Sequence, residues 1–181
     1  PRRKACHDDK AYVCSFDGTV ARIDTASLEV EAYAAAGRNP DGICVANGKL
    51  YVSNSGGLDN PDYDTTVSVI DIPAFTETGT ITVGANPGRI ATNRSGYVYV
   101  AVRNNLTANQ GNKRFVCIDS RTDQVVHTWN EQVLDFTIDG DFAYIFDYDP
   151  GSKASRVKLF NLVSGTVEQE NFITDGTRLE T

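Results

Sequence analysis

The sequence lacks methionine and long apolar runs, and it is poor in histidine, tryptophan and basic residues. It holds no Met, one Trp and two His in 181 residues. No apolar run reaches the ~18 residues of a transmembrane helix, so we expect no membrane span in this chain. Lys and Arg number 17 against 24 Asp and Glu, a formal charge of −7. Because nucleic acid is bound through clustered cations, we expect no nucleic-acid partner.

The four cysteines are too scattered for a metal centre. They form no C-x-x-C pair and have no His at ligand spacing, so the common zinc motifs are excluded. Each lies in an apolar run where a free thiol behaves as a small apolar side chain. We predict buried, unpaired thiols, with two disulfides as the alternative, and we expect no metal and no cofactor. These residues are Cys6, Cys14, Cys44 and Cys117.

A repeat organises the chain. A Tyr-aliphatic pair recurs at steps of 39, 48 and 45 residues, and an Ile-Asp pair or its relative follows each copy. The first pairs are Tyr12-Val13, Tyr51-Val52, Tyr99-Val100 and Tyr144-Ile145. The second pairs are Ile23-Asp24, Ile70-Asp71, Ile118-Asp119 and Phe160-Asn161. A third motif, Gly-x-Asn-Pro, occurs at residues 37–40 and 84–87, and Pro1 stands at the spacing of Pro40, so the chain begins inside a motif.

Each repeat predicts four short antiparallel strands. Runs rich in Val, Ile, Tyr and Thr alternate with Gly, Asn, Asp and Pro. In the second repeat we place the strands at 43–46, 49–54, 66–72 and 78–83. Several strands, such as 97–102, are apolar at every position, so their sheets need cover on both faces. An all-β fold of β-propeller blades follows from this period and this burial.

The repeats define one partial propeller domain over residues 1–181. We place them at about 1–39, 40–86, 87–131 and 132–174, with a further repeat starting at 175–181. The expected first strands lie near 3–7, 43–46, 89–93 and 134–139, and a fifth begins near 177. Four complete repeats with a fifth begun indicate part of a larger ring.

The motifs resemble the YVTN-family β-propeller repeat. The likeness is carried by Tyr-Val-Ser-Asn at 51–54, Thr-Val-Ser-Val-Ile-Asp at 66–71 and Gly-x-Asn-Pro-x-Gly. The resemblance implies a ring of about seven blades and an exported bacterial or archaeal protein of the periplasm or cell surface. The Gly-His and Trp-Asp signatures of WD40 repeats are missing.

The Asp of the Ile-Asp pair is predicted to have a structural role. It ends the third strand of each repeat, where an Asp side chain accepts backbone N–H bonds of the following turn. The Asn-Pro motifs also have the composition of turns. Neither His7 nor His127 has a nearby nucleophile in the sequence, so a catalytic triad has no local support.

Strand parity places the long loops on one face. In a blade of four antiparallel strands, the loops between the second and third strands emerge beside the connections between blades. We call this side the long-loop face. The insertions at 55–65, 104–113 and 147–154 all lie there, and long loops on a rigid scaffold commonly carry function. The candidate ligand-binding residues of these loops are Asp59, Asp62, Tyr63, Asp64, Asn104, Asn105, Asn109, Asp147, Tyr148 and Asp149.

Arginines beside the Asn-Pro turns are expected at the mouth of the central channel. Arginine binds carboxylate or phosphate through two donors at once, so we expect the ligand to carry an anionic group. The alternative is that these arginines pair with Asp41 and other turn carboxylates and hold neighbouring blades together. The residues are Arg3, Arg38, Arg89 and Arg178.

The sequence favours a non-enzymatic binding or scaffold propeller of the cell envelope. Its partner would be a polymer such as a polysaccharide, a peptide or a protein, held on the long-loop face. The alternative is a propeller enzyme of the lyase or lactonase type, with its active site at the central channel. We assign no catalytic residue in this chain.

Overall fold

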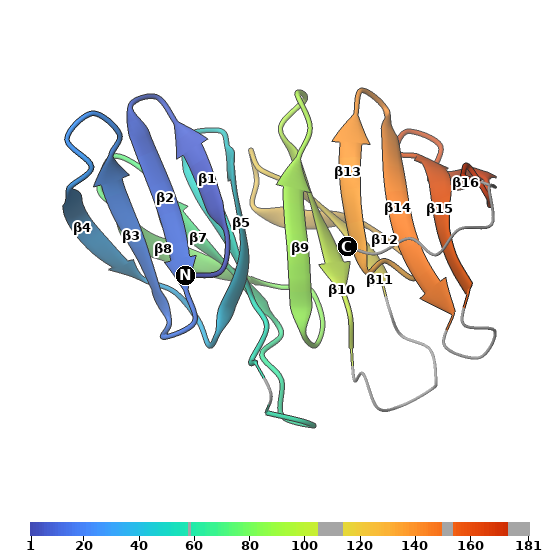
Figure 1. Cartoon of the computed structure of the whole chain (residues 1–181), viewed down its shortest axis with the longest axis horizontal. Coiled ribbons are helices and arrows are strands. Elements are labelled where there is room, and N and C mark those ends of the chain that lie inside the picture. The colour runs from blue at the N-terminus through green and yellow to red at the C-terminus, as the bar shows by residue number, and fades with distance from the viewer. Residues whose placement is uncertain (58, 105–113, 150–153, 174–181) are drawn as a thin grey trace.

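The computed structural model describes residues 1–57, 59–104, 114–149 and 154–173, and all regular structure in them is β-strand (Figure 1). The described residues therefore include no helix that could cross a membrane. The strands form four antiparallel four-stranded sheets, in which each strand pairs with its neighbours in sequence. This is the propeller-like architecture predicted from the repeat.

The sheets follow one another along the chain. The first contains β1 (Lys4–His7), β2 (Lys10–Ser15), β3 (Thr19–Asp24) and β4 (Val30–Ala35). The second contains β5 (Pro40–Ala46), β6 (Lys49–Asn54), β7 (Thr66–Asp71) and β8 (Thr76–Thr82). The third contains β9 (Pro87–Thr92), β10 (Tyr97–Val102), β11 (Arg114–Asp119) and β12 (Gln124–Trp129). The fourth contains β13 (Asp135–Asp139), β14 (Phe142–Asp149), β15 (Ala154–Asn161) and β16 (Thr166–Gln169).

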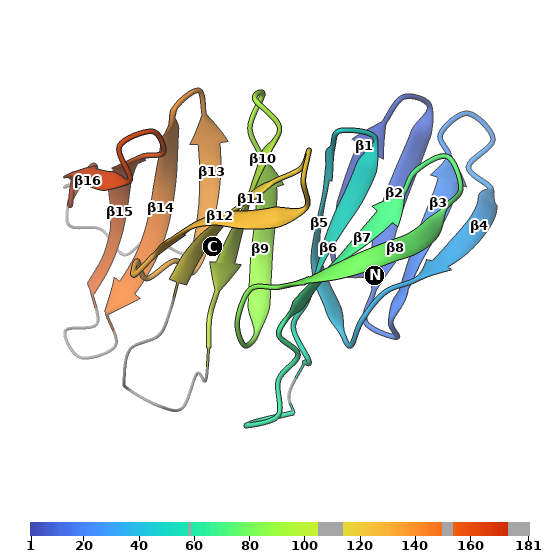
Figure 2. The same cartoon turned by 180° about the vertical axis from the view of Figure 1, so that it is seen from behind.

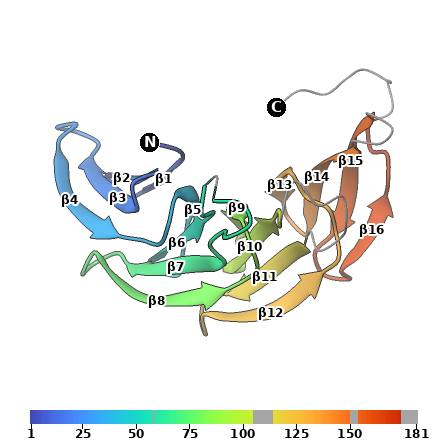
Figure 3. The same ribbon diagram turned by 90° about the horizontal axis from the view of Figure 1, so that it is seen from below.

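The four sheets stand side by side in an arc. Seen from below, the first strands β1, β5, β9 and β13 lie along the concave side, and the last strands β4, β8, β12 and β16 lie along the outer side (Figure 3). The same succession of sheets is visible from behind (Figure 2). The concave side is therefore where the long-loop ends of all four first strands meet.

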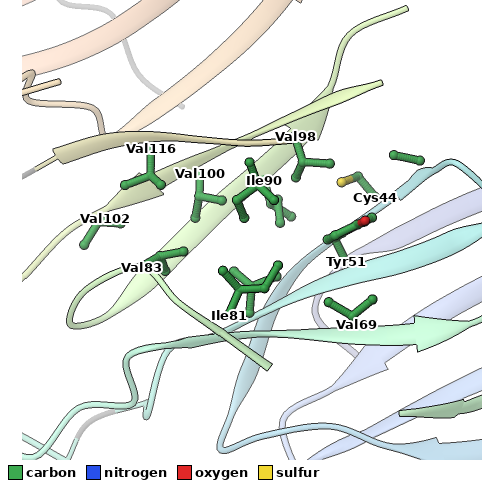
Figure 4. Packing of buried hydrophobic residues seen from close by; sticks show 13 residues of the cluster. Cys44, Tyr51, Val69, Ile81, Val83, Ile90, Val98, Val100, Val102 and Val116 are labelled. Carbon is green, nitrogen blue, oxygen red and sulfur yellow. The ribbon is translucent and has the colours of Figure 1, made fainter. Parts of the chain in front are cut away.

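Three apolar clusters fill the spaces between neighbouring sheets. One cluster joins the second and third sheets, and Figure 4 shows Val69 and Ile81 of the one facing Ile90 and Val100 of the other. In β10, Val100 belongs to this cluster, whereas Tyr99 belongs to the cluster between the third and fourth sheets. Alternate residues of a strand point to opposite faces, so the sheet is apolar on both. The burial of both faces of the sheet explains why a strand such as β10 is apolar at every position.

The packing has a direction along the chain. Tyr12 packs into the cluster between the first and second sheets, Tyr51 into the next and Tyr99 into the third. The Tyr of each pair thus lies on what we call the forward face, the side toward the following sheet. Tyr144 occupies this position in the fourth sheet, where it contacts Phe172 edge-to-face. The opposite side of each sheet is its backward face.

The Ile-Asp pairs have the predicted turn role. Asp24 Oδ1 accepts the N–H groups of Ala26 and Ser27 at 2.9 and 2.8 Å. Asp71 and Asp119 accept equivalent bonds from Ala74 and Arg121, and so does Asn161, which replaces Asp in the fourth sheet. The carboxylates therefore close turns and do not form a ring of ligands.

All four cysteines are free, as predicted. Cys6 pairs in register with Ala11 and not with Cys14, which separates the two thiols on neighbouring strands. The expectation of burial is correct for Cys14, Cys44 and Cys117 but wrong for Cys6, which is exposed. The reason is that Cys6 points away from the cluster that contains Tyr12, toward the uncovered backward face of the first sheet.

Candidate binding face

The long-loop face is assembled by backbone hydrogen bonds between loops. Ser55 N–H donates to Asn39 O, Asn86 N–H donates to Asp64 O, and Asn104 N–H donates to Ala85 O. Asn39 and Asn86 have positive φ angles of 50° and 56°, a conformation that Asn tolerates, and each precedes the Pro that begins β5 or β9. The connections between sheets and the second-to-third strand loops therefore lie together, as strand parity predicted.

Arginines gather at the concave end of this face. A cavity of about 380 Å³ is lined by Arg2, Arg3, Asp41 and Arg103. Asp41 is buried, and its two oxygens lie 3.2 Å from Arg2 Nη2 and 2.7 Å from Arg103 Nη2. Since these three residues belong to the first, second and third sheets, the carboxylate joins all three.

A second cavity opens between the first and second sheets on the same face. It measures about 460 Å³ and combines apolar, amide and charged groups. The Phe16 ring lies between the two cavities, because it lines this one and also faces the guanidinium of Arg2 at 5.2 Å. The lining residues are Phe16, Asp17, Gly18, Ala36, Gly37, Arg38, Asn39 and Asp64.

The predicted arginines separate into different positions. Arg3 lines the concave cavity, as expected. Arg38 does not join it, because its Nη1 lies 3.3 Å from Asp59 and its Nη2 donates to Asp62 O in the 55–65 loop. Arg89 Nε lies 3.3 Å from Asp135 Oδ1, so Arg89 links the third and fourth sheets. This is the alternative role, in which an arginine pairs with a carboxylate and holds neighbouring blades together. Arg178 lies outside the described residues.

Two loop candidates are buried. Tyr63, expected to be available to a ligand, is 8% exposed, because the loop turns back and brings Gly56 against the backbone of Tyr63. Asp147 is also buried, because β14 extends to Asp149 and places Asp147 in the sheet, 2.8 Å from Arg156. Both expectations of a surface position are corrected.

The remaining candidates are distributed over the face. Asp64 lines the second cavity and accepts the backbone N–H of Arg38. Tyr148 is half-buried at the end of β14, where its carbonyl accepts a bond from Gln132. Asn104 follows Arg103 and accepts a weak bond from Asn86 through its carbonyl. Asn105, Asn109 and the side chain of Asp149 lie outside the described residues.

Sequence reasoning missed several residues of the cavities, among them Arg2, Phe16 and Arg103. Arg103 directly follows the strand 97–102, so its position beside the Asn-Pro turn was a usable signal. Arg2 stands next to Pro1, at the position of Asp41 beside Pro40. Phe16 gave no comparable signal, because a single aromatic residue in a four-residue turn has no periodicity.

A further pocket lies on the opposite face. It has a volume of about 240 Å³, and its lining includes Tyr99, Cys117 and His127. Burial raises the pKa of the Cys117 thiol to about 12, so thiolate is scarce at neutral pH and nucleophilic chemistry is disfavoured. The described residues contain no group of three or more His, Cys, Asp or Glu able to hold a metal ion.

Comparison with known proteins shows the fold and leaves the family open. No protein-family model matches the chain. No curated protein matches it either. Among solved structures it resembles hydrazine synthase of Kuenenia stuttgartiensis, with a TM-score of 0.78, 21% identity, and coverage of 94% of this chain and 48% of that one. It also resembles the computationally designed protein Ika8, with a TM-score of 0.66, 11% identity, and coverage of 95% and 48%. The chain therefore spans about half the length of these proteins and shares a propeller-like fold with them.

Proposed function

We propose that this chain is a non-enzymatic binding or scaffold module that holds a polymer, peptide or protein partner on its long-loop face. The observation that carries the proposal is the pair of neighbouring cavities on that face, of about 380 and 460 Å³. Binding sites are concave and combine apolar surface with a few directed polar groups, and Phe16, Arg38 and Asp64 supply both.

The proposed cellular location is the periplasm or the cell surface. Its support is the resemblance of the Tyr-Val and Asn-Pro motifs to repeats of exported proteins. The net charge of −7 suits a protein partner or a polymer that carries no dense phosphate backbone. Fractionation of the producing cell with an antibody against this chain tests the location, and signal confined to the cytoplasm would contradict it.

Arrays of synthetic peptides and of purified polysaccharides test the binding function. The wild-type chain is compared with Phe16→Ala and Arg38→Ala on the long-loop face and with Arg121→Ala on the opposite face. Arg121 is a matched control because it is also an exposed arginine paired with an aspartate. We expect both long-loop variants to lose array signal and Arg121→Ala to retain it. Equal loss in all three, or loss in the control alone, refutes the proposed face.

A further inference from the structure

The concave end of the long-loop face holds more positive than negative charge. Within the described part of the chain, four guanidinium groups meet two carboxylates there, which leaves a formal charge of +2 in a chain whose net charge is −7. A local surplus of this kind attracts anions to a partly enclosed site. The guanidiniums belong to Arg2, Arg3, Arg89 and Arg103, and the carboxylates belong to Asp41 and Asp135.

Three of these guanidiniums face carboxylates without a directed hydrogen bond. Arg2, Arg3 and Arg103 donate no side-chain hydrogen bond to any residue in the described ranges, although all three lie within 4 Å of a carboxylate. Asp41 Oδ2 accepts no hydrogen bond even though Arg103 Nη2 is 2.7 Å away, so no N–H of Arg103 is directed at it. Each guanidinium offers five N–H donors, so a guanidinium that faces one carboxylate still has further donors for a ligand in the cavity that it lines.

Arg103 is held in place by its surroundings. Its backbone N–H donates to Asn86 O, and its guanidinium lies over Gly88, so close that a Cβ on Gly88 would collide with it. In the second sheet, Asp41 occupies the position that Gly88 has in the third, one residue after the Pro. Its carboxylate faces the guanidinium of Arg103. The absent side chain of Gly88 and the carboxylate of Asp41 together fix the position of Arg103, whose side chain is 23% exposed.

From this arrangement we propose that the cavity lined by Arg2, Arg3, Asp41 and Arg103 binds a doubly charged anionic group of the phosphate-monoester or dicarboxylate kind. Asp41 compensates one of the three arginines and leaves two, which matches a dianion. Planar guanidiniums bind two oxygens at once and suit both groups. A volume of about 380 Å³ also leaves room for part of the molecule that carries the charge. This inference rests on the proposed function, because it names the ligand chemistry of the same face.

Titration calorimetry with small anions tests the site without knowledge of the natural ligand. The full chain is titrated at pH 8 and fixed ionic strength with inorganic phosphate, with succinate and with acetate as the monoanion. We expect saturable binding of at least one dianion, at least tenfold tighter than acetate. The phosphate and succinate experiments decide between the two kinds of ligand. Equal affinity for acetate and both dianions, or no saturable binding, overturns the proposal.

Two variants locate the binding. Arg103→Ala removes one guanidinium and should weaken dianion binding at least tenfold. Gly88→Ala changes no charge but displaces the Arg103 guanidinium, so it should weaken binding in the same direction, and it carries the test if Arg103→Ala lowers the melting temperature. Arg121→Ala, on the opposite face, should bind like the wild type. Unchanged affinity in both cavity variants refutes the site. If no dianion binds but the array signal persists, the proposed ligand class is wrong and the proposed function stands. If phosphate binds but the array signal does not depend on this face, the proposed function is wrong and the anion site stands.

Discussion

Arg3 and Asp135 connect the first and fourth sheets across the concave side. Arg3 Nη2 lies 3.8 Å from Asp135 Oδ2, and Arg89 Nε lies 3.3 Å from the other oxygen of the same carboxylate. Asp135 thus faces one arginine from the adjacent sheet and one from the far end of the arc. This one carboxylate therefore links the first, third and fourth sheets at their long-loop ends.

The two arginines that face Asp135 should differ in their effect on stability. Arg89 also donates to Phe136 O and lies over the Phe136 ring, so Arg89→Ala should lower the free energy of unfolding by about 1–2 kcal/mol. Arg3 is more exposed and makes a longer contact, so Arg3→Ala should cost less than about 0.5 kcal/mol. Urea denaturation of both variants measures the difference. An Arg89→Ala variant as stable as the wild type would return Arg89 to the ligand-binding role predicted from the sequence.

A second link between sheets should be stronger, because its tyrosine is fully buried and donates to a charged group. Tyr51 of the second sheet donates a short hydrogen bond to Asp123 of the third, and Lys49 Nζ lies 2.7 Å from the same carboxylate. We expect Tyr51→Phe to lower the free energy of unfolding by about 1.5–3 kcal/mol, the range for bonds to charged groups. Tyr97→Phe is the matched control, since Tyr97 accepts a bond from the exposed Arg121. A similar small loss in both variants would show that the bond between Tyr51 and Asp123 contributes little.

The strands and their turns could be predicted because their signals are local. The strand predicted at 49–54 is the observed β6, and the turn Asp residues accept the bonds expected of them. The cavities depend on information that is not local. The strand pairing shifts its register between Pro40 and Gly42 of β5 and between Val100 and Val102 of β10. Asp41 lies at the first shift, and Arg103 directly follows the second. Loop parity placed Arg38 on the correct face, but no sequence signal shows that it bonds to Asp59 and Asp62 of the neighbouring 55–65 loop.

The cysteines should differ in reactivity. Burial raises the pKa of Cys44 and of Cys117 to about 12, and it also raises the pKa of Cys14, so these thiols stay protonated and shielded. Cys6 is exposed. With Ellman's reagent at pH 8 we expect one thiol to react in the native protein and four in denaturant. Fewer than four in denaturant would indicate a disulfide, and rapid reaction of several native thiols would contradict the burial.

The turn after β11 should make stability depend on acid pH. The Arg121 guanidinium and backbone N–H lower the pKa of Asp119 to about 2, below the value of ~3.9 in an unfolded chain. A lowered native pKa favours the folded state above about pH 4, and this contribution is lost as pH falls from about 4 through 2. Asp119→Asn should therefore be less stable than the wild type at pH 7, and the gap should narrow toward pH 2. Asn161 shows that Asn still accepts the turn bonds. A gap that stays constant with pH would contradict the mechanism.

The outer faces of the end sheets should make this chain self-associate. On the fourth sheet, Tyr144 pairs with Leu159 and Phe146 pairs with Val157, on the side opposite the Ile145 cluster. On the first sheet, Val13, Ala21 and Tyr33 form the backward face, and Tyr33 is 67% exposed. Every internal interface of the chain joins a forward face to a backward face. The backward face of the first sheet and the forward face of the fourth are therefore the two halves of the same kind of contact.

We expect the chain to form head-to-tail oligomers at micromolar concentration, because apolar sheet faces of this kind need cover. Leu159→Glu adds a charge to the centre of the forward face and should shift the sedimentation profile toward monomer. Val163→Glu adds the same charge to the same sheet, but in a turn where Val163 is already 78% exposed, and should leave association unchanged. Cooperative melting of a monodisperse wild-type monomer would contradict the prediction. Loss of association in Val163→Glu as well would show that added charge acts generally and that the forward face is not the contact.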